Sequence, residues 1–163
     1  MNIVTKQDLN LLIGSRFSDI GRSGDMLWLC FGDEIQWTDL HGNIRNVNEF
    51  SLHVQSAWRI TDGEQIVLAS NDIFITTGED DNWDTEGANL FDEKKSAVLA
   101  KLGSCPVVVE KVNLNENGDL RIVFSNSLTI EVFVISSIPI ENWRLINFKS
   151  ENDSFIVFDE VSE

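Results

Sequence analysis

The chain has 163 residues, 42% of them hydrophobic, and its 12 basic and 27 acidic side chains give a net charge of −15. This length and apolar content are typical of a single globular domain, 1–163, and exclude a disordered tail. The Lys and Arg residues are dispersed, and so strong a negative charge repels phosphate backbones and anionic bilayers. We therefore expect neither a nucleic acid nor a membrane as the partner.

The N-terminal stretch MNIVTKQDLNLLIG lacks the basic start and the continuous apolar segment of a secretory signal. No apolar run approaches the ~20 residues of a membrane helix. The two cysteines, Cys30 and Cys105, both lie in apolar stretches and are interpreted as reduced thiols of the core, with a structural disulfide as the alternative. These features predict a cytoplasmic protein.

The first predicted element is a short helix over about 5–13. Thr5 is a good N-cap residue, Leu9, Leu12 and Ile13 form one apolar stripe, and Gly14 ends the helix. From there to about residue 75 the hydrophobic period changes to two, which predicts strands.

Two stretches of this region carry the strand signal. Residues 26–32, MLWLCFG, form a nearly continuous apolar run, which is typical of a strand buried on both faces. Residues 51–60, SLHVQSAWRI, alternate as one strand with an apolar and a polar side. Asp62-Gly63 then predicts a hairpin turn.

A second short helix is predicted over about 92–102, capped by Asp92 and stopped by Gly103. Three β-rich runs follow, joined by turns at Asn117-Gly118 and Asn126-Ser127, and they predict a meander. Roughly ten short strands with hairpin-length connections require closure or a second layer. The expected fold is therefore α+β and β-rich, with two short helices on an antiparallel β-sandwich or a strongly curved, partly closed sheet.

The most unusual segment is 79–93, where seven acidic side chains fall within fifteen positions. Read from Asn82, its spacing is close to the calcium loop of EF-hands, in which alternate oxygens converge on the ion, and Asp84, Glu86 and Glu93 are the candidate ligands. The asparagine at the first position, the missing preceding helix and the missing partner loop argue against this interpretation. A solvated loop without a ligand is the structural alternative.

The same segment combines aromatic side chains with carboxylates, a combination that suits a protein-binding surface for a basic partner. The alternative is that Trp83 and Phe91 pack into the core and hold the loop in place. The candidate contacts are Trp83, Asp84, Glu86, Phe91, Asp92 and Glu93.

A second candidate site lies on the polar side of the 51–60 strand. His53 and Arg59 would stand in one row, and with Asp72 on a neighbouring strand His53 would act as a general base, or Arg59 would hold a carboxylate. In the structural alternative, Arg59 pairs with a nearby acid and His53 is a half-exposed strand residue. No catalytic residue is assigned, because the sequence has no nucleophile elbow, P-loop or zinc-ligand spacing.

Four stretches carry a family resemblance: DMLWLCFG (25–32), SLHVQSAWRI (51–60), ASNDIF (69–74) and ENWRLI (141–146). Through them most of the chain resembles a family of small bacterial proteins of unassigned function, in which an L-H-V-Q-x-x-W-R-I strand is followed by a strand that ends near an aspartate. The resemblance implies a bacterial, cytoplasmic setting and no activity or cofactor, and it draws attention to Trp58, Arg59 and Asp72. In size and charge alone the chain is also similar to immunity proteins that neutralise basic toxins.

We therefore expect a non-enzymatic, protein-binding module that meets a basic partner through 79–93 and through an acidic tail from Glu151. These two segments hold twelve of the 27 acidic residues. Immunity-type inhibition is the most specific version of this expectation. The alternative is a site for a small molecule or a divalent metal ion, centred on 53–59 or on 79–93, and such a site would also suit an enzyme. A divalent cation is the one cofactor considered.

Overall fold

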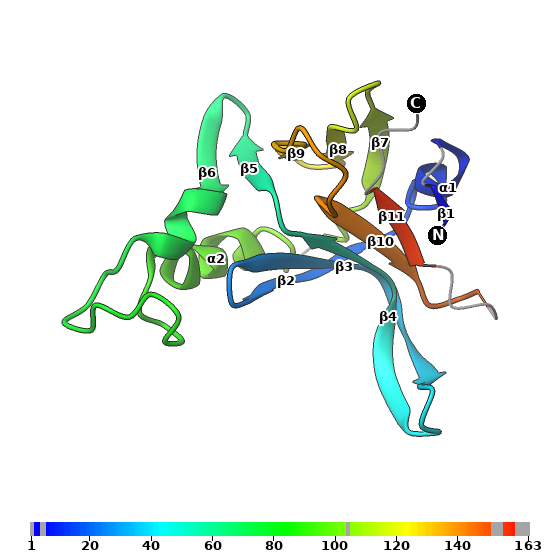
Figure 1. The fold of residues 1–163 in the computed structure, drawn as a ribbon, viewed down its shortest axis with the longest axis horizontal. Helices are drawn as coiled ribbons and strands as arrows, with labels where there is room; N and C mark the ends of the chain where they lie inside the picture. Colours follow the sequence, from blue (N-terminus) through cyan, green and yellow to red (C-terminus); the bar gives the residue numbers. More distant parts are fainter. Residues whose placement is uncertain (1, 4–5, 104, 151–154, 159–163) are drawn as a thin grey trace.

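The computed structural model describes residues 2–3, 6–103, 105–150 and 155–158, and the β-rich α+β prediction is confirmed (Figure 1). The larger sheet has the strand order β1-β11-β10-β4-β3-β2. Neighbouring strands in it run antiparallel, apart from the parallel pair β1 and β11. Its strands are β1 (Asn2–Ile3), β2 (Phe17–Ser23), β3 (Met26–Thr38), β4 (Ile44–Val54), β10 (Trp143–Asn147) and β11 (Phe155–Phe158).

The smaller sheet is antiparallel throughout, in the order β6-β5-β9-β8-β7, and it contains the predicted meander. Its strands are β5 (Ala57–Asp62), β6 (Gln65–Ala69), β7 (Val109–Leu114), β8 (Leu120–Phe124) and β9 (Leu128–Phe133). The helical elements are α1 (Lys6–Asn10), a 3-10 turn η1 (Ser70–Phe74) and α2 (Leu90–Ala100).

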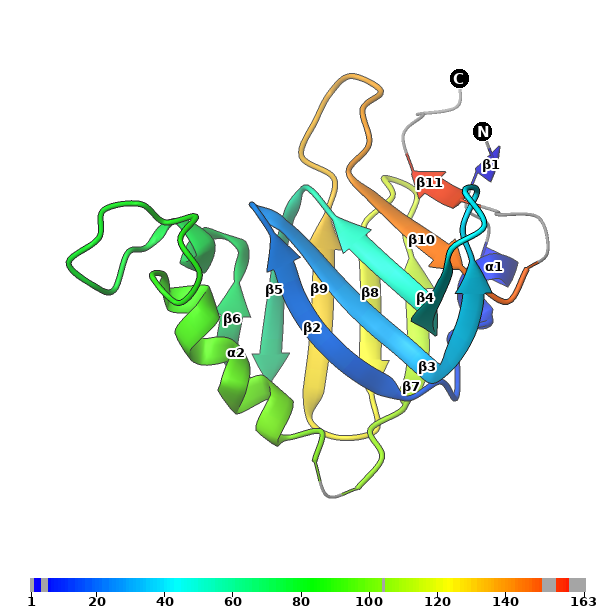
Figure 2. The ribbon, with the colours of Figure 1, turned by 90° about the horizontal axis from the view of Figure 1, so that it is seen from below.

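The inner faces of the two sheets share one hydrophobic core. Phe17 and Phe31 of the larger sheet stack on Phe124 of the smaller one, and the Phe17 and Phe124 ring centroids are 4.8 Å apart. Figure 2 shows the sheets one over the other with their strands crossing. Within the described residues the sheets do not close into a barrel.

The chain links the two layers on both sides. At Gln55 and Ser56 it leaves the larger sheet and enters the smaller one, and both backbone N–H groups donate to the Asn142 carbonyl. On the other side, the Phe17 N–H donates to the Val107 carbonyl over 2.8 Å. The opening that remains, between the edge strands β2 and β6, is covered by α2 (Figure 2).

Three local predictions are corrected by the structure. Residues 51–60 are not one strand, because the crossing at Gln55 and Ser56 divides them between the sheets. The 26–32 run is buried on one face only, since Leu27 and Leu29 are fully buried while Trp28 remains half-exposed. The second helix begins at Leu90 instead of 92, and Asn89, not Asp92, is its N-cap.

The first helix is shorter than predicted. It ends at Asn10, and hydrogen-bonded turns carry the chain on to Gly14, whose φ of 85° falls in the left-handed region that glycine tolerates. Leu9 and Leu12 are buried, as the apolar stripe predicted, whereas Ile13 is exposed.

Candidate binding surface

The loop between η1 and α2 protrudes at one end of the molecule and is closed at its base (Figure 1). Thr76 and Asn89 form an antiparallel bridge, and the Thr77 N–H donates to the Ala88 carbonyl over 3.0 Å. The fully buried Asn89 side chain accepts from the Asp92 N–H and donates to the Trp83 carbonyl, each over 2.8 Å. One amide therefore caps α2 and also anchors the loop that precedes it.

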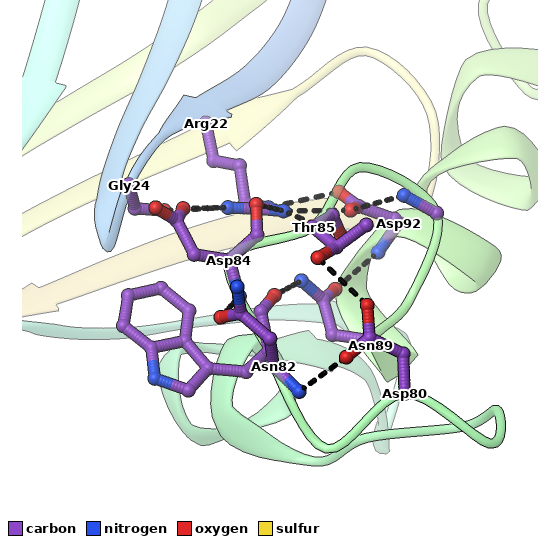
Figure 3. Close-up of polar contacts among 10 residues, drawn as sticks. Arg22, Gly24, Asp80, Asn82, Asp84, Thr85, Asn89 and Asp92 are labelled. Atoms are coloured by element: carbon purple, nitrogen blue, oxygen red, sulfur yellow. Dashed lines mark hydrogen bonds and ion pairs between the residues drawn. The ribbon is translucent and has the colours of Figure 1, made fainter.

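The body of the loop has its own hydrogen bonds (Figure 3). The Asp80 carboxylate accepts from the Asn82 N–H and from the Thr85 hydroxyl, each over 2.9 Å, and these bonds lower the pKa of Asp80. The Asn82 side chain in turn accepts from the Asp84 N–H over 3.1 Å. The loop therefore has an ordered conformation held by its own hydrogen bonds and is not an unstructured connection.

Arg22 of β2 connects this loop to the larger sheet. Its guanidinium donates through Nε and Nη2 to the two oxygens of Asp92, over 3.0 and 2.8 Å, and through Nη1 to Asp84 Oδ1 over 3.1 Å (Figure 3). It also donates to the carbonyls of Gly24, Asp84 and Thr85. The Arg22 and Asp92 side chains are only 8% and 5% exposed, so this pair is nearly desolvated.

The pairing changes the ionisation of both partners. Hydrogen bonds from the Arg22 side chain are the main cause that lowers the pKa of Asp92, and the Asp92 carboxylate raises the pKa of Arg22. Both groups are therefore held in their charged forms. Arg22 fixes β2, the loop and the first turn of α2 in one arrangement.

Most carboxylates of the loop remain available to solvent. Five of them are exposed, and none of the five forms an ion pair with any residue in the described part of the chain. These are Glu79, Asp80, Asp81, Glu86 and Glu93. The Asp84 side chain is 57% exposed although Arg22 binds one of its oxygens. From here on we call residues 79–93 the acidic loop.

The two aromatic residues of the acidic loop have different environments. Phe91 is fully buried and meets Trp58 edge to face at a centroid distance of 5.9 Å, so it belongs to the core. Trp83 is partly buried and packs edge to face on Phe74 at 4.9 Å. Of the two predicted aromatic contacts, only Trp83 remains partly exposed. It lies beside Phe74, whose side chain is 49% exposed.

Of the three residues that suggested a calcium loop, Asp84 is bound by a cation of the chain itself, Arg22. Asp84 gives a carboxylate oxygen and its carbonyl to the Arg22 guanidinium, so two of its oxygens are already engaged. The described residues contain no group of three or more His, Cys, Asp or Glu side chains placed to hold a metal ion. An ion site at Asp84, Glu86 and Glu93 stays a prediction, with Arg22 as its internal competitor.

The second candidate site is not assembled in the structure. His53 stands on the outer face of the larger sheet, in register with Trp28 and Arg144, whereas Arg59 stands on the outer face of the smaller sheet. Arg59 donates to Glu131 over 2.8 Å and lies over the Phe133 ring. These contacts match the structural alternative for Arg59.

Asp72 and His53 have separate local roles. Asp72 accepts from the Ala69 N–H over 2.9 Å and thereby caps η1. Burial, followed by the charge of Arg144, lowers the pKa of His53, which favours the neutral imidazole. No contact in the described part of the chain joins His53 to Arg59 or to Asp72.

The sequence reasoning missed Arg22 and the role of Asn89. Nothing in the RSGD stretch around Arg22 pointed to a partner 70 positions away in the chain. Asn89 did carry a local signal, because an N-cap asparagine three positions before an acidic residue is a common start of a helix.

Other predictions fall partly outside the described residues. Of the acidic tail, only the backbone of β11 is described, so Glu151 and the remaining acids of the tail lie outside it. Cys30 and Cys105 are free thiols, and burial raises the pKa of Cys30, but Cys105 is exposed and not a core residue. No helix in the described part of the chain has the length and apolar character needed to cross a bilayer.

Comparison of the chain with protein-family models, with curated proteins and with solved structures finds no match. The geometry of the acidic loop is therefore the basis on which a function can be proposed.

Proposed function

We propose that the chain is a cytoplasmic protein-binding module of bacterial origin that binds a basic protein through the acidic loop. The observation that carries the proposal is a loop held in one conformation by Arg22 and Asn89, with exposed carboxylates that have no ion-pair partner among the described residues. In this proposal the scaffold is a sandwich of the two sheets, and α2 covers its open side.

Preorganisation is the physical reason to favour binding over a purely solvated loop. Holding five exposed carboxylates close together costs repulsion energy, which a basic partner relieves on contact. Because the loop is already ordered, little conformational entropy is lost when the partner binds. Like-charged groups also accelerate encounter with an oppositely charged surface, and salt screens this effect.

Immunity-type inhibition is the specific version of the proposal. A basic toxin that acts on nucleic acid presents a positively charged cleft, and an ordered acidic protrusion complements such a cleft in charge and shape. This version predicts that the partner loses its activity in the complex.

The test begins with capture of partners from cells of the source organism, followed by binding of the purified basic partner over a range of salt concentrations. A loop variant has four exposed carboxylates neutralised, and a matched control has the same number neutralised at dispersed exposed positions. The loop variant is Glu79→Gln, Asp81→Asn, Glu86→Gln and Glu93→Gln, and the control is Glu34→Gln, Glu64→Gln, Glu110→Gln and Glu116→Gln.

We expect the loop variant to bind at least about tenfold more weakly at low salt and to show a shallower salt dependence, with the control close to wild type. Equal losses in the two variants would mean that net charge alone attracts the partner. Binding that does not respond to salt, or the absence of any basic partner, would contradict the proposal.

A further inference from the structure

A groove of about 340 Å³ runs along the side of the acidic loop that faces the larger sheet. One wall is the β2–β3 hairpin, and the other is formed by the loop and the first turns of α2. The groove therefore joins the proposed binding loop to the outer face of the larger sheet. Its main lining residues are Gly21, Arg22, Trp28, Asp84, Glu86 and Lys95.

The aromatic wall of the groove depends on a glycine. Gly21 and Trp28 are paired across β2 and β3, and a Cβ atom on Gly21 would lie 2.2 Å from Cζ2 of the Trp28 indole. The indole thus lies directly against the backbone of β2, in space that any larger residue would occupy. Trp28 remains half-exposed and contributes to the groove.

The acidic wall has unused acceptor capacity. Arg22 binds Asp84 through Oδ1, and Oδ2 has no hydrogen-bond partner among the described residues. Glu86 is exposed and forms no ion pair with any of the described residues. Of the two cations in the lining, Arg22 is already neutralised by Asp92, which leaves Lys95 to oppose the carboxylates.

We propose that this groove receives an arginine side chain of the basic partner, with the guanidinium beside the Trp28 ring and ion-paired to Glu86 and to the second oxygen of Asp84. The inference rests on the proposed function and makes it specific. An aromatic ring next to carboxylates favours a planar guanidinium, which stacks on the ring and donates hydrogen bonds to two acceptors at once, over a compact ammonium. Arg22, from the opposite wall, already pairs its guanidinium with the carboxylates of Asp84 and Asp92.

The first experiment needs no identified partner. The probe is N-acetylarginine amide, and the neutral isostere N-acetylcitrulline amide is its control. Binding is followed by the Trp28 indole N–H signal in a ¹H–¹⁵N NMR spectrum, which Trp28→Phe assigns. We expect a saturable shift of that signal with the arginine probe and none with citrulline. Glu86→Gln should weaken the response severalfold, whereas the matched Glu64→Gln should not.

The second experiment uses the captured basic partner. Trp28→Ala should weaken binding about tenfold and Trp28→Phe by less, because a cation–π contact contributes on the order of a few-fold to tenfold in affinity. Trp37→Ala is the matched control, since Trp37 lies against Phe148 and does not line the groove. Circular dichroism of each variant separates loss of binding from loss of fold.

The outcomes distinguish the groove from the wider proposal. If the acidic-loop variant abolishes partner binding, but neither the arginine probe nor Trp28→Ala has any effect, the groove inference is wrong and the proposed function stands. If the arginine probe titrates Trp28 but no basic protein is captured, the groove binds guanidinium and the proposed function fails. Equal shifts with arginine and citrulline would overturn the charge recognition on which the inference depends.

Discussion

At the scale of single residues, Arg22 has the largest structural role in the candidate surface. Its guanidinium is nearly buried and is shared between Asp92, Asp84 and backbone carbonyls of the loop. A buried ion pair adds little net stability compared with apolar packing, but removing one partner leaves an uncompensated charge. Arg22 therefore determines the position of the acidic loop more than it adds to overall stability.

We expect Arg22→Met to lower the free energy of unfolding by about 3 kcal/mol, because Asp92 would remain buried without its cation. The double variant with Asp92→Asn should recover part of this loss. Urea denaturation measures both effects. Arg16→Met is the control, since the Arg16–Asp33 pair is solvent-exposed at 3.7 Å and should cost less than about 1 kcal/mol. Similar losses of unfolding free energy for Arg22→Met and Arg16→Met would contradict the role of Arg22 in holding the acidic loop in place.

The lowered pKa of Asp92 predicts a dependence of stability on pH. A carboxyl whose folded pKa lies below its unfolded value, about 3.9, stabilises the fold above that value and loses the contribution as the pH falls through the folded pKa. Wild type should therefore lose more unfolding free energy than Asp92→Asn between about pH 5 and pH 3. Denaturant titrations at several pH values test this, and parallel curves for the two proteins would refute it.

At the scale of elements, α2 and the acidic loop form one unit because Asn89 belongs to both. Sequence patterns predicted this helix from Asp92 and Gly103, but placed its start two residues late, because Asp92 was interpreted as the N-cap. In the structure Asp92 sits in the first turn and faces Arg22. A distant cation therefore decided the role of a residue whose local pattern suggested capping.

We expect Asn89→Ala to destabilise the protein by about 2 kcal/mol, because it removes the N-cap and leaves the Trp83 carbonyl without its donor. Asn89→Ser should restore the cap and part of the loss. Thermal unfolding gives the stability, and hydrogen exchange of the amides in 77–89 reports the loop. Asn71→Ala is the control, because Asn71 is exposed. Faster hydrogen exchange in both variants would contradict a specific role of Asn89 in anchoring the loop.

The strands illustrate a different limit of sequence reasoning. The alternation in 51–60 correctly placed Trp58 and Ile60 inside, but the same alternation continues through the crossing at Gln55 and Ser56. Hydrophobic period reports which side of a strand is buried and not which sheet the strand joins. His53 and Arg59 were therefore predicted on one polar face although they lie on different sheets.

At the scale of the whole molecule, the concentration of negative charge in the acidic loop is the property on which the proposed function depends. Five exposed carboxylates of the acidic loop lie within fifteen positions of the chain and have no ion-pair partner among the described residues. We therefore expect them to repel one another more strongly than the same number dispersed over the surface. Arg22 and Asn89 hold this repulsive arrangement together.

This predicts that added salt stabilises the protein by screening the repulsion. Between about 20 mM and about 300 mM NaCl the Tm of wild type should rise by a few degrees. The four-site acidic-loop variant should show a smaller rise than the dispersed four-site control, because neutralisation has removed the closest like charges. Differential scanning calorimetry measures the shift, and identical slopes for the two variants would mean that the charge is not effectively concentrated.

Sequence patterns alone predicted that the chain builds antiparallel strands around an apolar core and that acidic residues concentrate in one long connection. These properties follow from local periodicity and composition, which act over a few residues. Three features could be seen only in the folded chain: Arg22 contacts Asp92, Trp28 lies on Gly21 beside the acidic loop, and His53 and Arg59 are separated. Such contacts depend on strand order and register between distant segments, and side-chain patterns constrain these only through the complete packing of the core.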